Sequence, residues 1–215
     1  MISLKREGDV CILTVSELLD LETVQGMHEV LDQVEQSTDA EILILTGAGK
    51  FFNNGLNLPF LMNLDADQQQ EFNQQLTRLF GRLLGFPLPT VAAINGHAFA
   101  GGAVLAAVCD MRIMRQDRGW WCLNEVNVGV PIVESVMAML SAKMPKHVLS
   151  EVVLTGRRYT AAEAKAAGIV DATASEDGLF EAACNVAAGM AGKERGIFTS
   201  LKRTLYSEEI AGLMP

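Results

Sequence analysis

The stretch NGHAFAGGAVLAAVC (residues 95–109) joins a glycine-rich turn to an entirely apolar segment. The apolar segment ends at Asp110 and is too short to cross a bilayer, so it predicts a helix that is buried on all sides. The run that precedes it, residues 89–95, is apolar and typical of a buried strand. A buried strand that enters a glycine turn and then a helix is the repeating unit of an α/β fold.

The rest of the chain continues this alternation. Further strands are predicted at 10–15, 41–46, 110–115 and 169–170, and further helices at 22–36, 65–84, 133–143, 147–154, 160–167, 179–191 and 196–210. The strand at 41–46 is almost wholly apolar, which predicts burial on both faces. With 215 residues, of which 49% are hydrophobic, the chain can bury one large core. The predicted class is therefore α/β.

Composition excludes several kinds of partner. A net charge of −9 argues against nucleic acid, because phosphate binding needs a basic face, but it allows one anionic small ligand held by local donors. No membrane span is predicted, and residues 1–7 carry neither a signal-peptide core nor a transit pattern, so we expect a cytoplasmic protein. The scattered cysteines predict buried thiols in a reducing compartment rather than metal ligands: Cys11, Cys109, Cys122 and Cys184.

One glutamate stands among apolar residues in the segment WWCLNEVNVG (residues 120–129). An isolated glutamate is usually exposed and inert, but the neighbours of Glu125 are Leu, Val and Trp, and burial raises the pKa of a carboxyl and suits it to act as a base. Glu134 has a simpler explanation as a first-turn helix acid. Asp110 is expected to cap or pair at the start of a strand. The charges expected to be solvated, with one or two free to contact phosphate, are Lys143, Lys146, Arg157 and Arg158.

Two turns follow predicted strands, at 53–56 and at 100–102. Each can present one backbone N–H at the ends of neighbouring strands, where sites in α/β proteins tend to form. Two such donors aimed at a thioester oxygen would stabilise an enolate by about 3–4 kcal/mol each. The alternative is that Gly101 and Gly102 merely allow close packing of a helix on a strand, and the residues alone do not decide between these explanations.

Three segments, in order, resemble the crotonase (enoyl-CoA hydratase/isomerase) superfamily. KFFNNGLNL (residues 50–58) resembles its first oxyanion segment, and residues 89–110 resemble the second. LTGRRYTAAEAKAAGIV (residues 154–170) is very close to a third. The resemblance implies the ClpP/crotonase spiral of strand-strand-helix repeats over 1–195, an abbreviated C-terminal helical segment at 196–215, and homotrimers or dimers of trimers.

The same resemblance assigns roles to individual residues. The oxyanion donors are the backbone N–H groups of Leu56 and Gly101. The acyl-CoA substrate would bind mainly through backbone along the first turn and beside the second, at Asn53, Asn54, Gly55, Asn57, Leu58, Gly102 and Val104. Asn57 departs from the Asp that the family usually carries. Coenzyme A is part of the substrate, so neither a separate cofactor nor a metal is expected.

The family comparison also implies which reaction is catalysed. Hydratases carry one catalytic glutamate at the position of Val104, which cannot activate water, and a second at the position of Glu125. LNEVNVG (residues 123–129) is closer to the corresponding segment of Δ3,Δ2-enoyl-CoA isomerases, in which one glutamate works alone. The resemblance thus implies a β-oxidation isomerase that moves a double bond from position 3 to position 2. The alternatives are a weak hydratase, a thioesterase or a non-catalytic CoA-binding relative.

Overall fold

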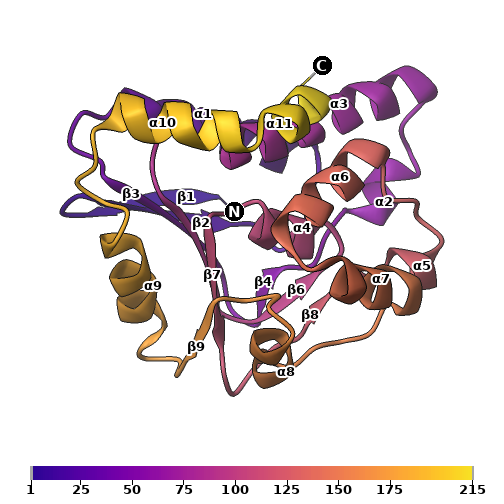
Figure 1. Ribbon diagram of the computed structural model, residues 1–215. Helices are drawn as coiled ribbons and strands as arrows, with labels where there is room; N and C mark the ends of the chain where they lie inside the picture. The colour runs from indigo at the N-terminus through magenta and orange to yellow at the C-terminus, as the bar shows by residue number, and fades with distance from the viewer. Residues whose placement is uncertain (1, 215) are drawn as a thin grey trace.

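Two sheets form the framework of the computed structural model, which describes residues 2–214 (Figure 1). The larger sheet has the order β1-β2-β3-β5-β7-β9. Its strands are β1 (Ser3–Glu7), β2 (Val10–Val15), β3 (Ile42–Gly47), β5 (Thr90–Ile94), β7 (Met111–Arg115) and β9 (Ala172–Ala174). β1 pairs with β2 antiparallel, and the other neighbours in this sheet are parallel.

The smaller sheet consists of three short parallel strands in the order β4-β6-β8. They are β4 (Phe51–Asn53), β6 (His97–Phe99) and β8 (Trp121–Cys122). Because parallel strands point the same way, their carboxyl ends lie at one edge of the sheet. This arrangement decides which residues meet at the candidate site.

Helices cover both faces of the larger sheet. The helices described within residues 2–214 are α1 (Leu21–Gln36), α2 (Leu58–Leu61), α3 (Ala66–Leu84), α4 (Gly101–Ala107), α5 (Glu125–Val128), α6 (Glu134–Lys143), α7 (Lys146–Thr155), α8 (Ala161–Ala166), α9 (Leu179–Ala188), α10 (Arg195–Leu205) and α11 (Ser207–Leu213). In Figure 1, α9 lies on the opposite side of this sheet from α1 and α3. None of the helices described within residues 2–214 is long and apolar enough to cross a membrane.

The strand predicted at 41–46 corresponds to β3, and its predicted burial on both faces is confirmed. Leu43 and Leu45 of β3 belong to the main core, whereas Ile42 and Ile44 belong to a second cluster that α9 covers. This alternation is what a strand's period of two produces when both faces are covered. The predicted all-buried helix is also confirmed, because every residue of α4 is buried.

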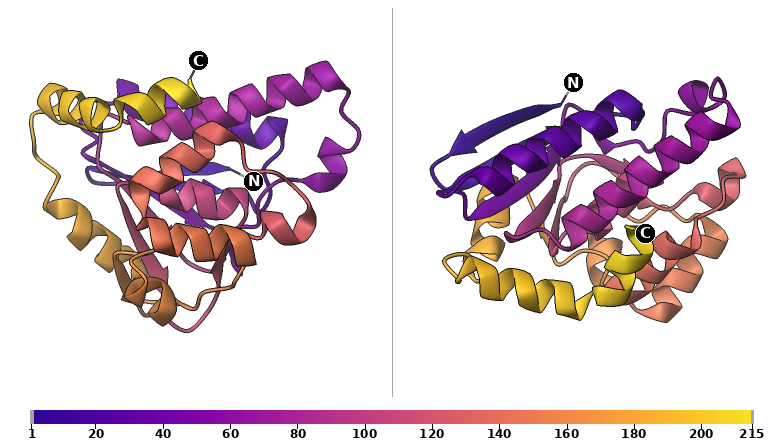
Figure 2. Two further views of the ribbon diagram at one scale, coloured as in Figure 1. Left: turned by 45° about the vertical axis from the view of Figure 1, so that its right-hand side comes forward. Right: turned by 90° about the horizontal axis from the view of Figure 1, so that it is seen from above.

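Two predicted elements differ from the structure. The strand predicted at 169–170 lies instead at β9, because Ile169 and Val170 form the turn after α8 and bury their side chains in the main core. The single helix predicted at 196–210 is divided at Tyr206 into α10 and α11. The two C-terminal helices lie along the body of the molecule, with α11 against α3 (Figure 2).

Candidate active site

The site is assembled at the carboxyl ends of the three strands of the smaller sheet. β4 leads into the turn that holds Leu56, β6 leads through Ala100 into Gly101, and β8 leads into Glu125. The two predicted oxyanion turns and the predicted base therefore lie beyond the same sheet edge. This is the place where open parallel sheets bind their ligands.

The two turns are in direct contact. Gly55 has φ +87°, and a Cβ built on it would lie 2.9 Å from the Ala100 Cβ and 3.3 Å from the Gly101 nitrogen. Any larger residue at position 55 would therefore clash as well as strain the backbone. Ala100 itself has φ +48°, although it carries a Cβ. The backbone between β6 and α4 is thus held in a conformation that an alanine rarely adopts.

Close packing explains Gly102 more completely than it explains Gly101. A Cβ on Gly102 would lie 2.1 Å from the Asn53 carbonyl oxygen, so this position admits no side chain. A Cβ on Gly101 would meet the Leu19 side chain at 3.3 Å, a contact that a flexible side chain can relieve. The alternative explanation from the sequence, that the glycines serve packing, is therefore confirmed for Gly102.

Each of the two turns contains a backbone N–H group that has no hydrogen-bond partner among residues 2–214. Within residues 2–214, neither the Leu56 N–H nor the Gly101 N–H donates a hydrogen bond. Their neighbours are engaged, since Asn57 N–H donates to the Leu19 carbonyl at 2.8 Å. Gly101 is the first residue of α4, where an N–H has no intrahelical acceptor. Two free N–H groups in turns that touch each other can both donate to one negatively charged oxygen.

Asn53 builds the first turn from inside. It is fully buried; its side-chain amide donates to the Ser16 carbonyl at 2.8 Å, and its oxygen accepts from the Gly55 N–H at 2.9 Å. The Asn53 side chain is thus used within the turn and is not offered to a ligand. Asn54 is half-buried, and Leu58 is exposed. These residues can present backbone or side-chain atoms to solvent.

The hydrogen-bond partners of Asn57 explain why this position carries an Asn rather than the Asp that is usual in the family. Its side-chain oxygen accepts from the Phe60 N–H at the start of α2, and its amide donates to an Asp20 carboxylate oxygen, both at 3.3 Å. An Asp at this position would place two carboxylates against each other. The amide therefore suits the Asp20 neighbour that this chain provides.

Glu125 is a buried carboxyl with no counter-ion in the described part of the chain. It is 9% exposed, and its Oε2 has no hydrogen-bond partner among residues 2–214. Burial raises the pKa of Glu125, and a hydrogen bond from its own backbone opposes part of that rise. Val104, on α4, is buried. Glu134 begins α6 and is exposed, as predicted for a first-turn acid.

The surroundings predicted for Glu125 are only partly correct. Leu123 and Trp121 are buried, but Trp120, Val126 and Val128 are exposed. The flanking apolar residues in the sequence therefore do not all face the carboxyl group.

A cavity of about 730 Å³ lies between α1, α3 and the C-terminal helices, and none of the predicted site residues lines it. Within residues 2–214, no group of three or more His, Cys, Asp or Glu is placed to hold a metal ion. The four thiols have raised pKa values, chiefly through burial, although Cys184 is half-buried rather than buried.

Comparisons with known proteins identify the family of this chain. Residues 13–209 match the sequence model of the family described as enoyl-CoA hydratase/isomerase. The chain belongs to this family. It is 32% identical over 221 residues to Enoyl-CoA delta isomerase 3 of Arabidopsis thaliana, a match that covers 97% of this chain and 93% of the relative. It is 35% identical over 170 residues to a putative enoyl-CoA hydratase of Thermus thermophilus, covering 77% and 66%.

The fold is confirmed by solved structures. The crystal structure of an enoyl-CoA hydratase/isomerase family protein from Pseudomonas syringae superposes with a TM-score of 0.91 at 25% identity, over 99% of this chain and 93% of that one. The predicted crotonase architecture is therefore correct.

Proposed function

We propose that this family member is a Δ3,Δ2-enoyl-CoA isomerase in which Glu125 acts as the single catalytic base and acid. The observation that carries the proposal is the solitary carboxyl. Glu125 is buried with no counter-ion among residues 2–214, and Val104 stands where hydratases of the family carry another glutamate. Similarity to an enoyl-CoA delta isomerase over nearly the whole chain supports the same reaction.

The proposed reaction needs one proton carrier and one oxyanion site. The thioester oxygen of a 3-enoyl-CoA accepts hydrogen bonds from the N–H groups of Leu56 and Gly101. The Glu125 carboxylate removes a proton from C2, and the electron pair moves into a dienolate whose negative charge rests on that oxygen. Glu125 then returns the proton to C4, and the double bond settles between C2 and C3. Its raised pKa lowers the cost of holding the proton between the two steps.

Hydration of a 2-enoyl-CoA needs a second carboxylate, and Val104 stands at the position where hydratases of the family carry it. Addition of water to a 2-enoyl-CoA requires a water molecule that is aligned and deprotonated, work that hydratases divide between two glutamates. The Val104 side chain neither accepts nor donates a hydrogen bond. The coenzyme A part of the substrate would bind along residues 53–58, mainly through backbone. We extend the proposal to fatty-acid β-oxidation, to assembly as a homotrimer or a dimer of trimers, and to chemistry without a further cofactor.

The reaction is tested by offering the purified protein two substrates in separate assays. Conversion of a 3-enoyl-CoA to its 2-enoyl isomer, without hydration of a 2-enoyl-CoA, is the expected result. Hydration at a comparable rate would refute the one-carboxylate argument. Release of free coenzyme A as the main product would instead identify a thioesterase.

The role of Glu125 is tested by Glu125→Gln, which keeps the size of the side chain and removes its basicity. We expect turnover of the 3-enoyl-CoA to fall by at least about a hundredfold, because acid–base assistance is typically worth about 10²–10⁴ in rate. Glu134→Gln is the matched control, since Glu134 is exposed, and it should retain the wild-type rate. Near-normal turnover in Glu125→Gln would show that another group is the base.

A further inference from the structure

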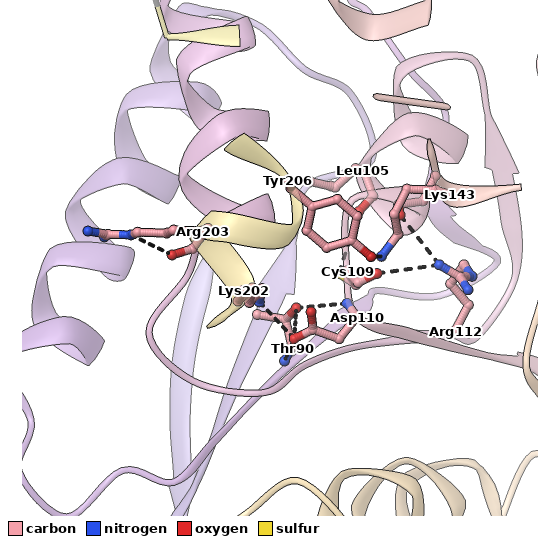
Figure 3. A network of polar contacts seen from close by, with 11 residues as sticks. Thr90, Leu105, Cys109, Asp110, Arg112, Lys143, Lys202, Arg203 and Tyr206 are labelled. Carbon is pink, nitrogen blue, oxygen red and sulfur yellow. Dashed lines mark hydrogen bonds and ion pairs between the residues drawn. The ribbon is translucent and has the colours of Figure 1, made fainter. Parts of the chain in front are cut away.

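A cluster of charged side chains surrounds the carboxyl end of α4, the helix that begins with Gly101 (Figure 3). The cations are Arg112 from β7, Lys143 from the end of α6 and Lys202 from α10. The carboxylates in contact with them are Asp110 and Asp171. Segments far apart in the chain therefore bring three cations to one end of a buried helix.

Two of the cations have defined partners there. Arg112 donates to the carbonyl oxygens of Ala107 and Cys109, at 3.4 Å each, and pairs with Asp171 at 2.8 Å. Lys202 Nζ lies 2.7 Å from Asp110 Oδ2. Cations at the carboxyl end of a helix are favourable because the last carbonyl groups carry partial negative charge.

Lys143 is different, because no carboxylate pairs with it. Its nearest polar partner is the Tyr206 hydroxyl at 3.5 Å, and Figure 3 shows the amine beside that hydroxyl. Among residues 2–214, no Asp or Glu oxygen lies within ion-pair distance of its Nζ. The sequence predicted a solvated charge, which is wrong because the segment around Tyr206 covers the amine. Burial, with repulsion from Arg112, lowers the pKa of Lys143 to about 8.

The Lys143 ammonium and the Gly101 N–H lie at opposite ends of α4, close enough for the charge to act on an anion at the candidate oxyanion site. Seven residues of α helix span roughly 10 Å, with Gly101 at one end and the cation cluster at the other. Every residue of α4 is buried, so solvent screens the interaction along the helix less than it would on the surface. At an effective dielectric of about 20, one unit charge roughly 12 Å from a developing anion changes the rate by up to about tenfold.

We propose that Lys143 is a positioning residue for the enolate-forming reaction: its unpaired ammonium, held at the carboxyl end of α4, strengthens the hold of the Gly101 N–H on the developing oxyanion. The inference rests on the proposed function, because the charge that it stabilises is that of the enolate oxygen. It adds to that function a residue that touches neither substrate nor Glu125.

The consequence is a second titration in the activity profile. Glu125 must be ionised to act as a base, so activity rises with pH on the acid side. Loss of the Lys143 proton as pH rises through about 8 removes the stabilising charge, so activity then falls. The groups that face Lys143 are Arg112, Lys202, Asp110, Cys109 and Tyr206. Burial keeps Cys109, with a pKa of about 12, and Tyr206, with a raised pKa, protonated through this range.

The test compares pH–rate profiles of the 3-enoyl-CoA isomerisation for wild type, Lys143→Met and Lys143→Arg, with Lys146→Met as a control at an exposed lysine. In the wild type and the control, the rate should fall by about threefold to tenfold above pH 8. Lys143→Met should be slower by the same factor at pH 7 and should lack the fall. Lys143→Arg, which stays charged, should keep the high rate past pH 9. A Lys143→Met protein with the wild-type rate and the wild-type fall would overturn the proposal.

A second measurement needs no turnover. The infrared stretch of the thioester carbonyl of a bound saturated acyl-CoA moves to lower frequency as the oxyanion donors polarise it. The shift at pH 7 should be smaller in Lys143→Met than in the wild type and restored in Lys143→Arg. Equal shifts in all three would refute the role of Lys143 even if the wild type is no isomerase. A wild-type protein that neither binds acyl-CoA nor turns it over would refute the proposed function and this inference together.

Discussion

The Lys202–Asp110 pair offers the sharpest test of how the C-terminal helices are held. Asp110 Oδ2 accepts from the Thr90 N–H at 2.8 Å and the Thr90 hydroxyl at 3.0 Å, and it pairs with Lys202 at 2.7 Å. The Lys202 and Asp110 side chains are 5% and 13% exposed. Asp110 thus ties the start of β5 to α10 through atoms that water hardly reaches. The expectation that Asp110 pairs at a strand start is confirmed.

Asp110→Asn should lower the free energy of unfolding by about 3–5 kcal/mol, because it leaves the Lys202 ammonium buried without a counter-ion. Lys202→Met should lower the free energy of unfolding by less than Asp110→Asn does, because the Asp110 carboxylate keeps both Thr90 donors and is partly exposed. In the double variant neither uncompensated charge remains. Its loss should therefore be well below the sum of the single losses, with a coupling energy of at least about 1 kcal/mol.

Urea unfolding followed by far-ultraviolet circular dichroism at pH 7 measures all four proteins of this cycle. Lys146→Met serves as a reference for replacing an exposed lysine, and it should change stability by less than about 0.5 kcal/mol. Single losses below about 1 kcal/mol, or a double variant that is simply additive, would refute the view that the buried pair holds α10.

Three further predictions concern positions at which the structure makes a definite demand. Gly102→Ala should lower the free energy of unfolding by several kcal/mol, about 3 or more, and reduce turnover, because its Cβ would lie 2.1 Å from the Asn53 oxygen. Gly189→Ala is the control: no atom lies nearer than 4.0 Å to the Cβ that it adds, so thermal melts of the two variants should show that only Gly102→Ala is destabilised. In the folded wild type the pKa of Lys143 is about 8, below the ordinary 10.5, so between these values the unfolded protein binds more protons and the free energy of unfolding rises with pH. Lys143→Met should lack this rise and be more stable than the wild type at pH 7 by up to about 3 kcal/mol. Wild-type denaturation curves that do not change from pH 7 to 10 would contradict this. Asn57→Asp should lower the free energy of unfolding by about 1 kcal/mol at pH 7 and by less at pH 4, because it places a second carboxylate beside Asp20. If variant and wild type have equal urea midpoints at both pH values, the side chain at position 57 and Asp20 do not interact.

The sequence predicted the elements that are long or strongly apolar. β3 and α4 are buried on all sides, and their unbroken apolar runs show this without any knowledge of their neighbours. β4, β6 and β8 were not predicted as a separate sheet, because strands of two or three residues are too short to show an alternating pattern. β1 was also missed, since its side chains are mostly exposed and carry no apolar periodicity.

By itself, the sequence determined the family and the order of the main elements, and it predicted two oxyanion turns and one catalytic glutamate, because those signals lie within single segments. Tertiary structure alone decided that Gly102 must lie against the Asn53 backbone and that Glu125 is buried while Val126 and Val128 are exposed. It also decided that no carboxylate among residues 2–214 pairs with Lys143. Each of these depends on contact between segments far apart in the chain. Local sequence shows which residues share a face, but burial and charge pairing are set by what the rest of the chain places against that face.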